Sequence, residues 1–163
     1  MTLDRPVVKE NTTLVFRSST QGGFSNAIES DPRHVEARKR PGRVDVRFAD
    51  AECIVQTTEG MVHAKAGDAI LTGSGGEHWR VSRGHFSKKY VPVPPTVAGD
   101  GGPYRALPYR ILALCMGDPF EVILSDGISR LSGRRGDWLV DYGDGSLGIV
   151  APPIFAGTYE ILA

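Results

Sequence analysis

The chain has 163 residues, a length that suits one domain or two very small ones. Its 19 basic and 19 acidic side chains cancel, so a strongly basic surface for nucleic acid is not expected. No apolar run approaches the length of about 18 residues that a membrane span needs. Residues 1–10 lack the apolar core of a signal peptide, and we therefore expect a cytoplasmic protein. The two cysteines are too few for a disulfide framework or a four-thiolate zinc site.

In chain order, the sequence predicts an extension followed by two series of short strands separated by glycine turns. The extension covers residues 1–33, with one expected strand at Thr13–Phe16. The segment Pro94–Pro103 holds three prolines and three glycines and is interpreted as a linker. Strands of the first series are expected at 43–48, 53–58, 61–65, 69–72, 78–81 and 91–93, with a helical turn at 83–89. In the second series, strands are expected at 147–150 and 160–162, with a helical turn starting at Pro152.

The two series align with each other, which indicates an internal duplication. Arg43–Gly60 lies on Arg110–Gly127 at an offset of 67 residues, and beyond Lys65 the offset is 69. The alignment places a two-residue insertion at Gly133-Arg134, which we expect to lie in a loop. Identical residues recur at equal spacings: Gly67-Asp68 with Gly136-Asp137, Phe86 with Phe155, and Tyr90 with Tyr159. We expect these phenylalanine and tyrosine rings to anchor each helical turn on its sheet.

This pattern predicts a mainly β protein, α+β at the margin, built from two similar small antiparallel-sheet or barrel units. Each unit has one short helical turn, and a pseudo-twofold axis relates the two. The units are expected at residues 34–93 and 104–163, joined by the linker 94–103. Because a unit of about 50 residues buries too little surface to be stable alone, the two should pack through an apolar face or share strands.

The two cysteines align with aromatic residues of the opposite series. Cys53 corresponds to Phe120, and Cys115 corresponds to Phe48. Positions that accept either residue type are typical of a core. We therefore predict that both cysteines are reduced, buried and unpaired.

One stretch of the first series resembles the PGDYG family, which comprises small proteins of bacteria and bacteriophages. The stretch runs from Thr57 to Gly73 and contains the pattern E-G-x-x-x-A-x-x-G-D; it continues through Gly76-Glu77-His78-Trp79 to Phe86 and Tyr90. The second series resembles the family through Gly136-Asp137-Trp138, Pro153, Phe155 and Thr158-Tyr159-Glu160. The first series has Ala69 where the family has an aromatic residue, and the second series has Ser146 where the first has Glu77. The resemblance implies a tandem, diverged member, and it implies no activity for these residues.

The Gly-Asp pairs match the repeated pattern of the two series more closely than any other residues. As carboxylates, Asp68 and Asp137 could act as general acids or bases. Glycine, however, supplies positive φ angles, and aspartate caps a turn through its own backbone. We interpret Gly67, Asp68, Gly136 and Asp137 as structural turn residues.

No other motif indicates a specific chemistry. The side chains with metal-ligating chemistry are His63, Glu77, His78 and His85, but Glu77 and His78 point to opposite faces of one strand. No zinc spacing occurs, and the glycine turns 73–76 and 143–145 lack the Lys-Ser/Thr of a phosphate-binding loop. We therefore expect no metal, no cofactor and no catalytic residue. The basic run Arg38–Arg40 is interpreted as a solvated edge.

Two functional hypotheses remain. The first is a non-enzymatic binding or accessory protein of bacterial or bacteriophage origin. The alternative is a small-molecule or nucleotide-related enzyme, or a ligand-binding protein, whose site lies between the two units. The ligand-binding residues would then be Trp79, Tyr90, Trp138 and Tyr159. An enzyme requires convergent titratable groups with shifted pKa values, whereas a binding protein requires only a suitable apolar surface.

The charge distribution bears on assembly. Residues 34–93 carry ten basic and seven acidic side chains, and residues 94–163 carry five and eight. Units of opposite sign favour packing against one another within one chain. We expect a protein or small-molecule partner, no nucleic acid and no membrane, and a monomer or weak homodimer.

Overall fold

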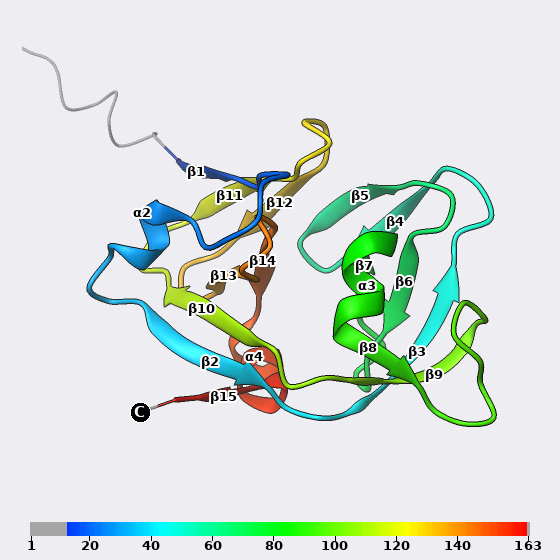
Figure 1. Ribbon diagram of the computed structural model, residues 1–163. Helices are drawn as coiled ribbons and strands as arrows, with labels where there is room; N and C mark the ends of the chain where they lie inside the picture. Colours follow the sequence, from blue (N-terminus) through cyan, green and yellow to red (C-terminus); the bar gives the residue numbers. More distant parts are fainter. Residues whose placement is uncertain (1–12, 163) are drawn as a thin grey trace, which may run out of the picture.

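The structure, a computed structural model, describes residues 13–162 and consists mainly of β-strands (Figure 1). The helices are short: α2 (Asn26–Glu29), α3 (Arg83–Lys89) and α4 (Pro152–Thr158). The prediction of a mainly β protein is confirmed. The strands are β1 (Leu14–Arg17), β2 (Val35–Lys39), β3 (Arg43–Phe48), β4 (Cys53–Thr57), β5 (Gly60–Ala64), β6 (Ala69–Thr72), β7 (His78–Val81), β8 (Tyr90–Pro92), β9 (Gly102–Ala106), β10 (Arg110–Cys115), β11 (Phe120–Ile123), β12 (Arg130–Gly133), β13 (Trp138–Asp141), β14 (Leu147–Val150) and β15 (Tyr159–Ile161).

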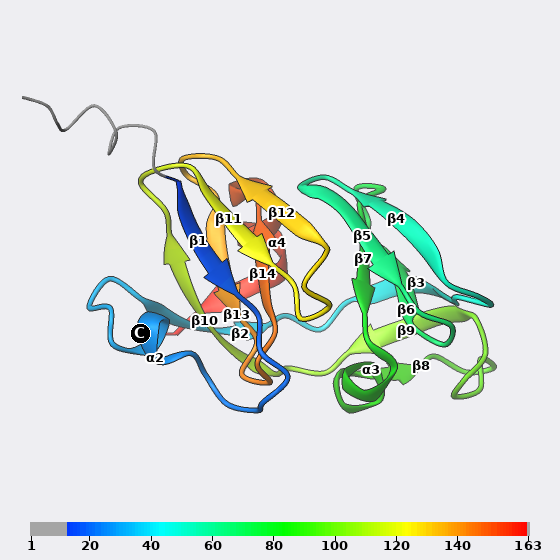
Figure 2. The same cartoon turned by 90° about the horizontal axis from the view of Figure 1, so that it is seen from above.

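Two five-stranded sheets form the two halves of the molecule (Figures 1 and 2). The first half has the order β7-β6-β3-β9-β8, and the second has the order β14-β13-β10-β2-β15. All neighbouring strands in both sheets are antiparallel. The two orders are equivalent, since β3, β6, β7 and β8 occupy the places of β10, β13, β14 and β15. Both sheets are open, and neither closes into a barrel.

Strands β2 and β9 are exchanged between the halves. β2 precedes β3 in the chain but pairs with β10 and β15 of the second half. β9 precedes β10 but pairs with β3 and β8 of the first half. The halves thus share strands, which is one of the two arrangements expected for units too small to fold alone. The unit limits 34–93 and 104–163 stay a prediction, and the strand pairing runs across them.

A β-hairpin from each half meets the other at the centre of the molecule. The hairpins β4–β5 and β11–β12 lie side by side (Figure 2). The Ser132 N–H donates to the Glu59 carbonyl at 2.9 Å, and the His63 N–H donates to Ser129 Oγ at 2.9 Å. Strand β1 adds to β11 in parallel, so the second hairpin becomes a three-stranded sheet.

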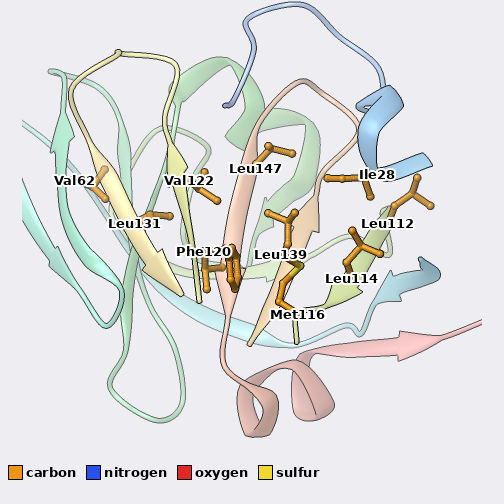
Figure 3. Close-up of a cluster of buried hydrophobic side chains, with 11 residues drawn as sticks. Ile28, Val62, Leu112, Leu114, Met116, Phe120, Val122, Leu131, Leu139 and Leu147 are labelled. Atoms are coloured by element: carbon orange, nitrogen blue, oxygen red, sulfur yellow. The ribbon is translucent and has the colours of Figure 1, made fainter. Parts of the chain in front are cut away.

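The largest buried cluster crosses this central interface (Figure 3). Val62 of β5 packs with Leu131 of β12, and Phe120 and Leu139 continue the cluster into the second half. All four side chains are at most 8% exposed, so the interface excludes water. Apolar burial therefore holds the halves together in addition to the exchanged strands.

Each of the helices α3 and α4 is anchored by a phenylalanine and the tyrosine four residues later. The rings of Phe86 and Tyr90 stack with centroids 5.0 Å apart, and those of Phe155 and Tyr159 lie 5.2 Å apart. All four residues are buried. The predicted anchoring role of these rings is confirmed.

The two Gly-Asp turns have matching hydrogen bonds. The N–H groups of Lys65 and Arg134 each donate to the aspartate three residues later, Asp68 or Asp137, at 2.9 Å. The preceding glycines, Gly67 and Gly136, have φ angles of +91° and +95°. An L side chain rarely adopts this conformation, so both positions favour glycine.

The expected insertion lies elsewhere than predicted. Cys53 pairs with Ala64 in the first hairpin, and its counterpart Phe120 pairs with Gly133 in the second, so the offset rises from 67 to 69 between the two strands of the hairpin. The extra residues therefore lie in the β11–β12 turn, and the prediction of Gly133-Arg134 is wrong. Two extra residues within a paired strand would disturb its register against its partner, whereas a turn can absorb added length. Here Asp126 closes the longer turn by accepting bonds from the N–H groups of Ile128 and Ser129.

The prediction that both cysteines are buried is also wrong. Cys115 is exposed and Cys53 is half-buried, although both are unpaired as expected. Cys115 is the last residue of β10, where the buried stretch of the strand ends. Its Sγ lies 3.7 Å from the Gly136 carbonyl oxygen, so it packs beside the Gly-Asp turn.

Candidate functional site

A cleft of about 520 Å³ lies between the two halves of the molecule. Its first wall comes from β7, α3 and the start of β8, and its second from β14, α4 and the start of β15. Lys39 at the end of β2 and Tyr109, just before β10, also line it. A cleft of several hundred Å³ suits a small organic ligand.

Lys39 is the most unusual residue of the cleft. It lies on the same face of β2 as Val35 and Ala37 and is only 8% exposed. Its Nζ lies 5.8 Å from the ring centroid of Trp79 and 5.3 Å from that of Tyr159. Within residues 13–162, no carboxylate lies within 4.0 Å of this nitrogen. The pKa of Lys39 is lowered to about 8, mainly by burial. The positive charge of Lys89 also lowers this pKa, whereas the negative charge of Glu77 raises it.

Four tyrosine side chains surround the same region: Tyr90, Tyr109, Tyr142 and Tyr159. Burial raises the pKa of each of their hydroxyls. The hydroxyls therefore stay protonated at neutral pH and can donate hydrogen bonds. The cleft thus contains phenol hydroxyls together with the Lys39 ammonium.

Lys89 differs from Lys39 because it has a carboxylate partner. Its Nζ lies 2.8 Å from Asp144 Oδ2, and His85 Nδ1 lies 3.4 Å from the same oxygen. The Lys89 ammonium also lies over the rings of Tyr109 and Tyr142, at 4.8 and 4.7 Å from their centroids. These contacts join α3 of the first half to the β13–β14 turn of the second, where the basic and acidic halves meet.

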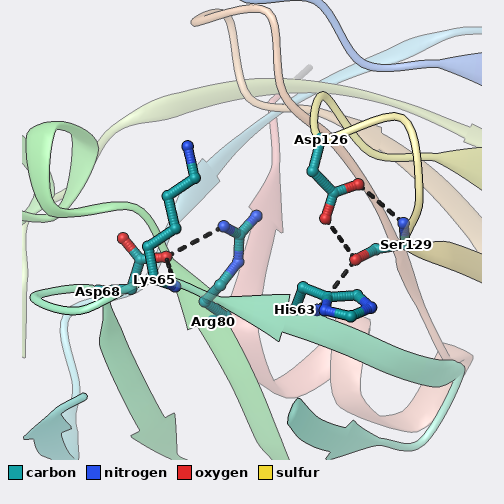
Figure 4. A network of polar contacts seen from close by, with 6 residues as sticks. All are labelled: His63, Lys65, Asp68, Arg80, Asp126 and Ser129. Atoms are coloured by element: carbon teal, nitrogen blue, oxygen red, sulfur yellow. Dashed lines mark hydrogen bonds and ion pairs between the residues drawn. The ribbon is translucent and has the colours of Figure 1, made fainter. Parts of the chain in front are cut away.

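The other end of the cleft holds a network of polar contacts (Figure 4). Arg80 forms an ion pair with Asp68 at 3.2 Å, while its buried Nε has no hydrogen-bond partner within residues 13–162. Asp126 accepts a hydrogen bond from Ser129 Oγ at 2.5 Å, and that hydroxyl in turn accepts the bond from the His63 N–H. The bond between His63 and Ser129 links β5 to the β11–β12 turn across the interface, whereas the contacts of Asp68 stay within the first half.

Glu59, in the β4–β5 turn, is a further lining residue with a strongly shifted pKa. Burial raises the pKa of Glu59 to about 7, and the negative charge of Asp137 adds to the shift. The charges that act on Lys39 belong instead to Glu77 and Lys89. The charge of Glu59 acts on Tyr142, so neither Lys39 nor Glu59 has the other as its main charged neighbour.

Three of the four predicted ligand-binding residues line the cleft. Trp79, Tyr90 and Tyr159 do so, but Trp138 does not, because its ring stacks on Phe155 with centroids 4.1 Å apart. Of the two turn aspartates, Asp68 lines the cleft and Asp137 does not.

Sequence reasoning missed Lys39, Lys89, Tyr109 and Tyr142. The interpretation of Arg38–Arg40 as a solvated edge is wrong for Lys39, which is buried, and correct for the exposed Arg38 and Arg40. Alternation was the available signal, since Val35, Ala37 and Lys39 occupy every second position. For the other three residues no local signal exists, because their surroundings come from the opposite half.

The structure adds two findings about other classes of site. Within residues 13–162, no group of three or more histidine, cysteine or carboxylate side chains is placed to hold a metal ion. No helix in this part of the chain combines the length and apolar character that crossing a membrane requires.

Comparison with known proteins gives one match. A family model described as PGDYG protein matches residues 60–160, which includes both walls of the cleft. No curated protein and no solved structure matches the chain.

Proposed function

We propose that this chain, which belongs to the PGDYG protein family, is a binding protein whose small organic ligand lies in the cleft between its two halves. The observation that carries the proposal is Lys39, a buried ammonium beneath two aromatic rings and without a carboxylate partner in residues 13–162. A charged group in such a place lowers stability, so its presence favours a role in binding.

Binding without catalysis is the better supported of the two hypotheses. The pKa values of the lining tyrosines are raised, and the lining residues Lys39 and Glu59 also have strongly shifted pKa values, which is a property of active sites. Different charges act on them, however, and general acid–base chemistry requires groups that converge on one reacting atom. The enzymatic alternative predicts a turnover that depends on both residues.

The organisation of the chain supports a proposal of duplication. The strand orders of the two sheets are equivalent, and β2 and β9 are exchanged reciprocally. We propose that a tandem repeat of one ancestral unit produced the two halves and that the cleft arose at their junction. A single-copy ancestor would have exchanged the same strand between two subunits of a homodimer.

We also propose a cellular location, a ligand class and an oligomeric state for this chain. We propose a bacterial or bacteriophage protein of the cytoplasm, on the basis of the family resemblance and two unpaired cysteines. The zero net charge supports a small-molecule ligand more than nucleic acid. The exchanged strands β2 and β9 complete both sheets within one chain. This arrangement supports a monomer.

A fragment screen by two-dimensional NMR tests the proposal. A few hundred neutral, anionic and cationic fragments should include several that shift the backbone signals of β7, α3, β14 and α4 together. The variant Ile154→Trp fills the cleft from α4 and should abolish these shifts, whereas Val97→Trp, at a 63% exposed position outside the cleft, should retain them. The absence of any fragment at the cleft, or equal binding to Ile154→Trp, would contradict the proposal.

A further inference from the structure

Building on the proposed function, we infer that the cleft takes a small organic anion and that its carboxylate or phosphate group contacts the Lys39 ammonium. The anion would approach from the open side of Nζ, opposite the rings of Trp79 and Tyr159. Its organic part would lie against the aromatic walls. The inference names the charge of the ligand, which the proposed function leaves open.

The first argument is the missing counter-ion. Transfer of an ammonium group into a buried place is unfavourable unless an anion or hydrogen-bond acceptors compensate it. The two aromatic rings compensate only part of this cost, since their centroids lie 5.3 and 5.8 Å from Nζ. The lowered pKa of Lys39 reflects the part of this unfavourable free energy that the rings leave uncompensated. A bound anion would supply what the described residues do not.

The second argument comes from the other half of the molecule. Lys39 pairs with Tyr159 at the end of β2, and the equivalent residue at the end of β9, which pairs with Tyr90, is Ala106. Ala106 is 2% exposed and belongs to the core beneath α3. The fold is therefore satisfied by a small apolar residue at this position, and the lysine is not needed to complete the sheet.

The third argument is the contrast with Lys89. In the same cleft, Lys89 has Asp144 at 2.8 Å, so the chain places a carboxylate where a structural ion pair is formed. Glu77 is the charged group that acts most strongly on the pKa of Lys39. Its Oε1, however, accepts a hydrogen bond from the Gly75 N–H at 2.9 Å. Glu77 is thus engaged in its own turn, and Lys39 lines the cleft without an ion pair to any residue of 13–162.

The fourth argument is the set of donors. The hydroxyls of Tyr109, Tyr142 and Tyr159 are protonated at neutral pH, as any phenol is at its ordinary pKa, and burial raises their pKa values further. A phenol can donate to an anion's oxygen, and hydrogen bonds to charged groups are the stronger kind. Tyr159 lies beside the Lys39 ammonium, and Tyr109 and Tyr142 lie beside the Lys89 ammonium. A cleft that combines ammonium groups with phenol hydroxyls suits an anionic group better than a cation.

The test compares three ligands that share one ring: benzoate, phenyl phosphate and the neutral benzamide. Dissociation constants are measured by NMR titration on the full chain at pH 7. We expect at least one anion to bind the cleft tenfold or more tightly than benzamide. Binding of benzoate alone assigns a carboxylate ligand, and binding of phenyl phosphate alone assigns a phosphate ligand; either supports the inference.

Variants then identify the residue. Lys39→Ala, which copies Ala106, and Lys39→Met should each remove the preference for the anion. Arg38→Ala is the matched control, because it removes one positive charge from the adjacent, exposed position of β2. It should change the dissociation constant less than twofold. NMR spectra that retain the dispersion of the wild type show that each variant is folded.

The outcomes separate the two proposals. If cleft-binding fragments are found but benzamide binds as tightly as both anions, the inference is wrong and the binding function stands. The same conclusion follows if both Lys39 variants keep the anion preference. If no fragment of any charge reaches the cleft, the binding function itself fails, and this inference fails with it.

Discussion

At the scale of single residues, Lys39 and Glu59 are held where their charged forms are disfavoured. Lys39 has a folded-state pKa of about 8, below the 10.5 of an exposed lysine, so the folded chain binds its proton less tightly than the unfolded chain. Glu59 has a folded-state pKa of about 7, above the usual 4.5, so the folded chain binds that proton more tightly. The two residues therefore make stability depend on pH in opposite directions.

Lys39→Met should stabilise the protein. Below pH 8 the lysine is charged in both states, and the full cost of burying it falls on the folded state. We expect the free energy of unfolding at pH 7 to rise by about 1–3 kcal/mol, measured by urea denaturation. The gain should shrink as the pH rises from 8 to about 10.5. Arg38→Met is the exposed control, and a Lys39→Met variant less stable than the wild type would contradict the account.

Glu59→Gln should stabilise the protein only where Glu59 would lose its proton in the unfolded chain. Below about pH 4.5 both states hold the proton, so the variant and the wild type should be equally stable. Between pH 4.5 and 7 the difference should grow, and above pH 7 it should level off at about 1–3 kcal/mol. Urea denaturation across this range measures it. A constant difference at all pH values would show that the burial of Glu59 is not the cause.

At the scale of elements, each half depends on one aromatic pair beneath a short helix. Phe86→Ala and Phe155→Ala should each lower the free energy of unfolding by about 3–5 kcal/mol, because each removes a buried ring that packs against a tyrosine. Ile128→Ala, at a 68% exposed position, should change it by less than about 0.5 kcal/mol. Thermal and urea denaturation measure both. A loss below about 1 kcal/mol in either phenylalanine variant would refute the anchoring role.

The Gly-Asp turns allow a test of backbone strain without steric conflict. A methyl group at Gly136 would meet no atom within 4 Å, so Gly136→Ala should cost only the strain of its positive φ, about 1–2 kcal/mol. Gly157 lies in α4 with equal space and no positive φ, so Gly157→Ala should be neutral or stabilising. Urea denaturation of the two variants gives the comparison. Equal changes in the free energy of unfolding in the two variants would contradict the claim that the positive φ of Gly136 favours glycine in the Gly-Asp turn.

Elements controlled by local chemistry were predictable from the sequence. Strands β3, β6 and β7 and helix α3 occur at the predicted residues, because glycine turns and alternating apolar residues are local signals. The partners of β2 were not predictable, since pairing with β10 and β15 joins residues far apart in the chain. The same limit explains why the cleft's aromatic residues were found only in part. Trp138 carries the same aromatic signal as Trp79, and only the packing of Phe155 distinguishes them.

At the scale of the whole molecule, the two halves depend on each other in three ways. They exchange β2 and β9, they bury Val62 against Leu131, and they join Lys89 to Asp144. The cleft lies at this junction, so a ligand held there contacts both halves at once. Ligand binding should therefore stabilise the whole chain, by about 2.7 kcal/mol at one hundred times its dissociation constant.

The two tryptophans provide the most direct measurement of the central claim, that the ligand lies in the cleft between the halves. Trp79 lines the cleft and Trp138 does not, and each indole N–H gives its own NMR signal, which Trp138→Phe assigns. During titration with a cleft-binding anion such as benzoate, the account predicts that the Trp79 indole signal moves to saturation while the Trp138 signal stays in place. A Trp138 signal that moves while the Trp79 signal stays unchanged would contradict it.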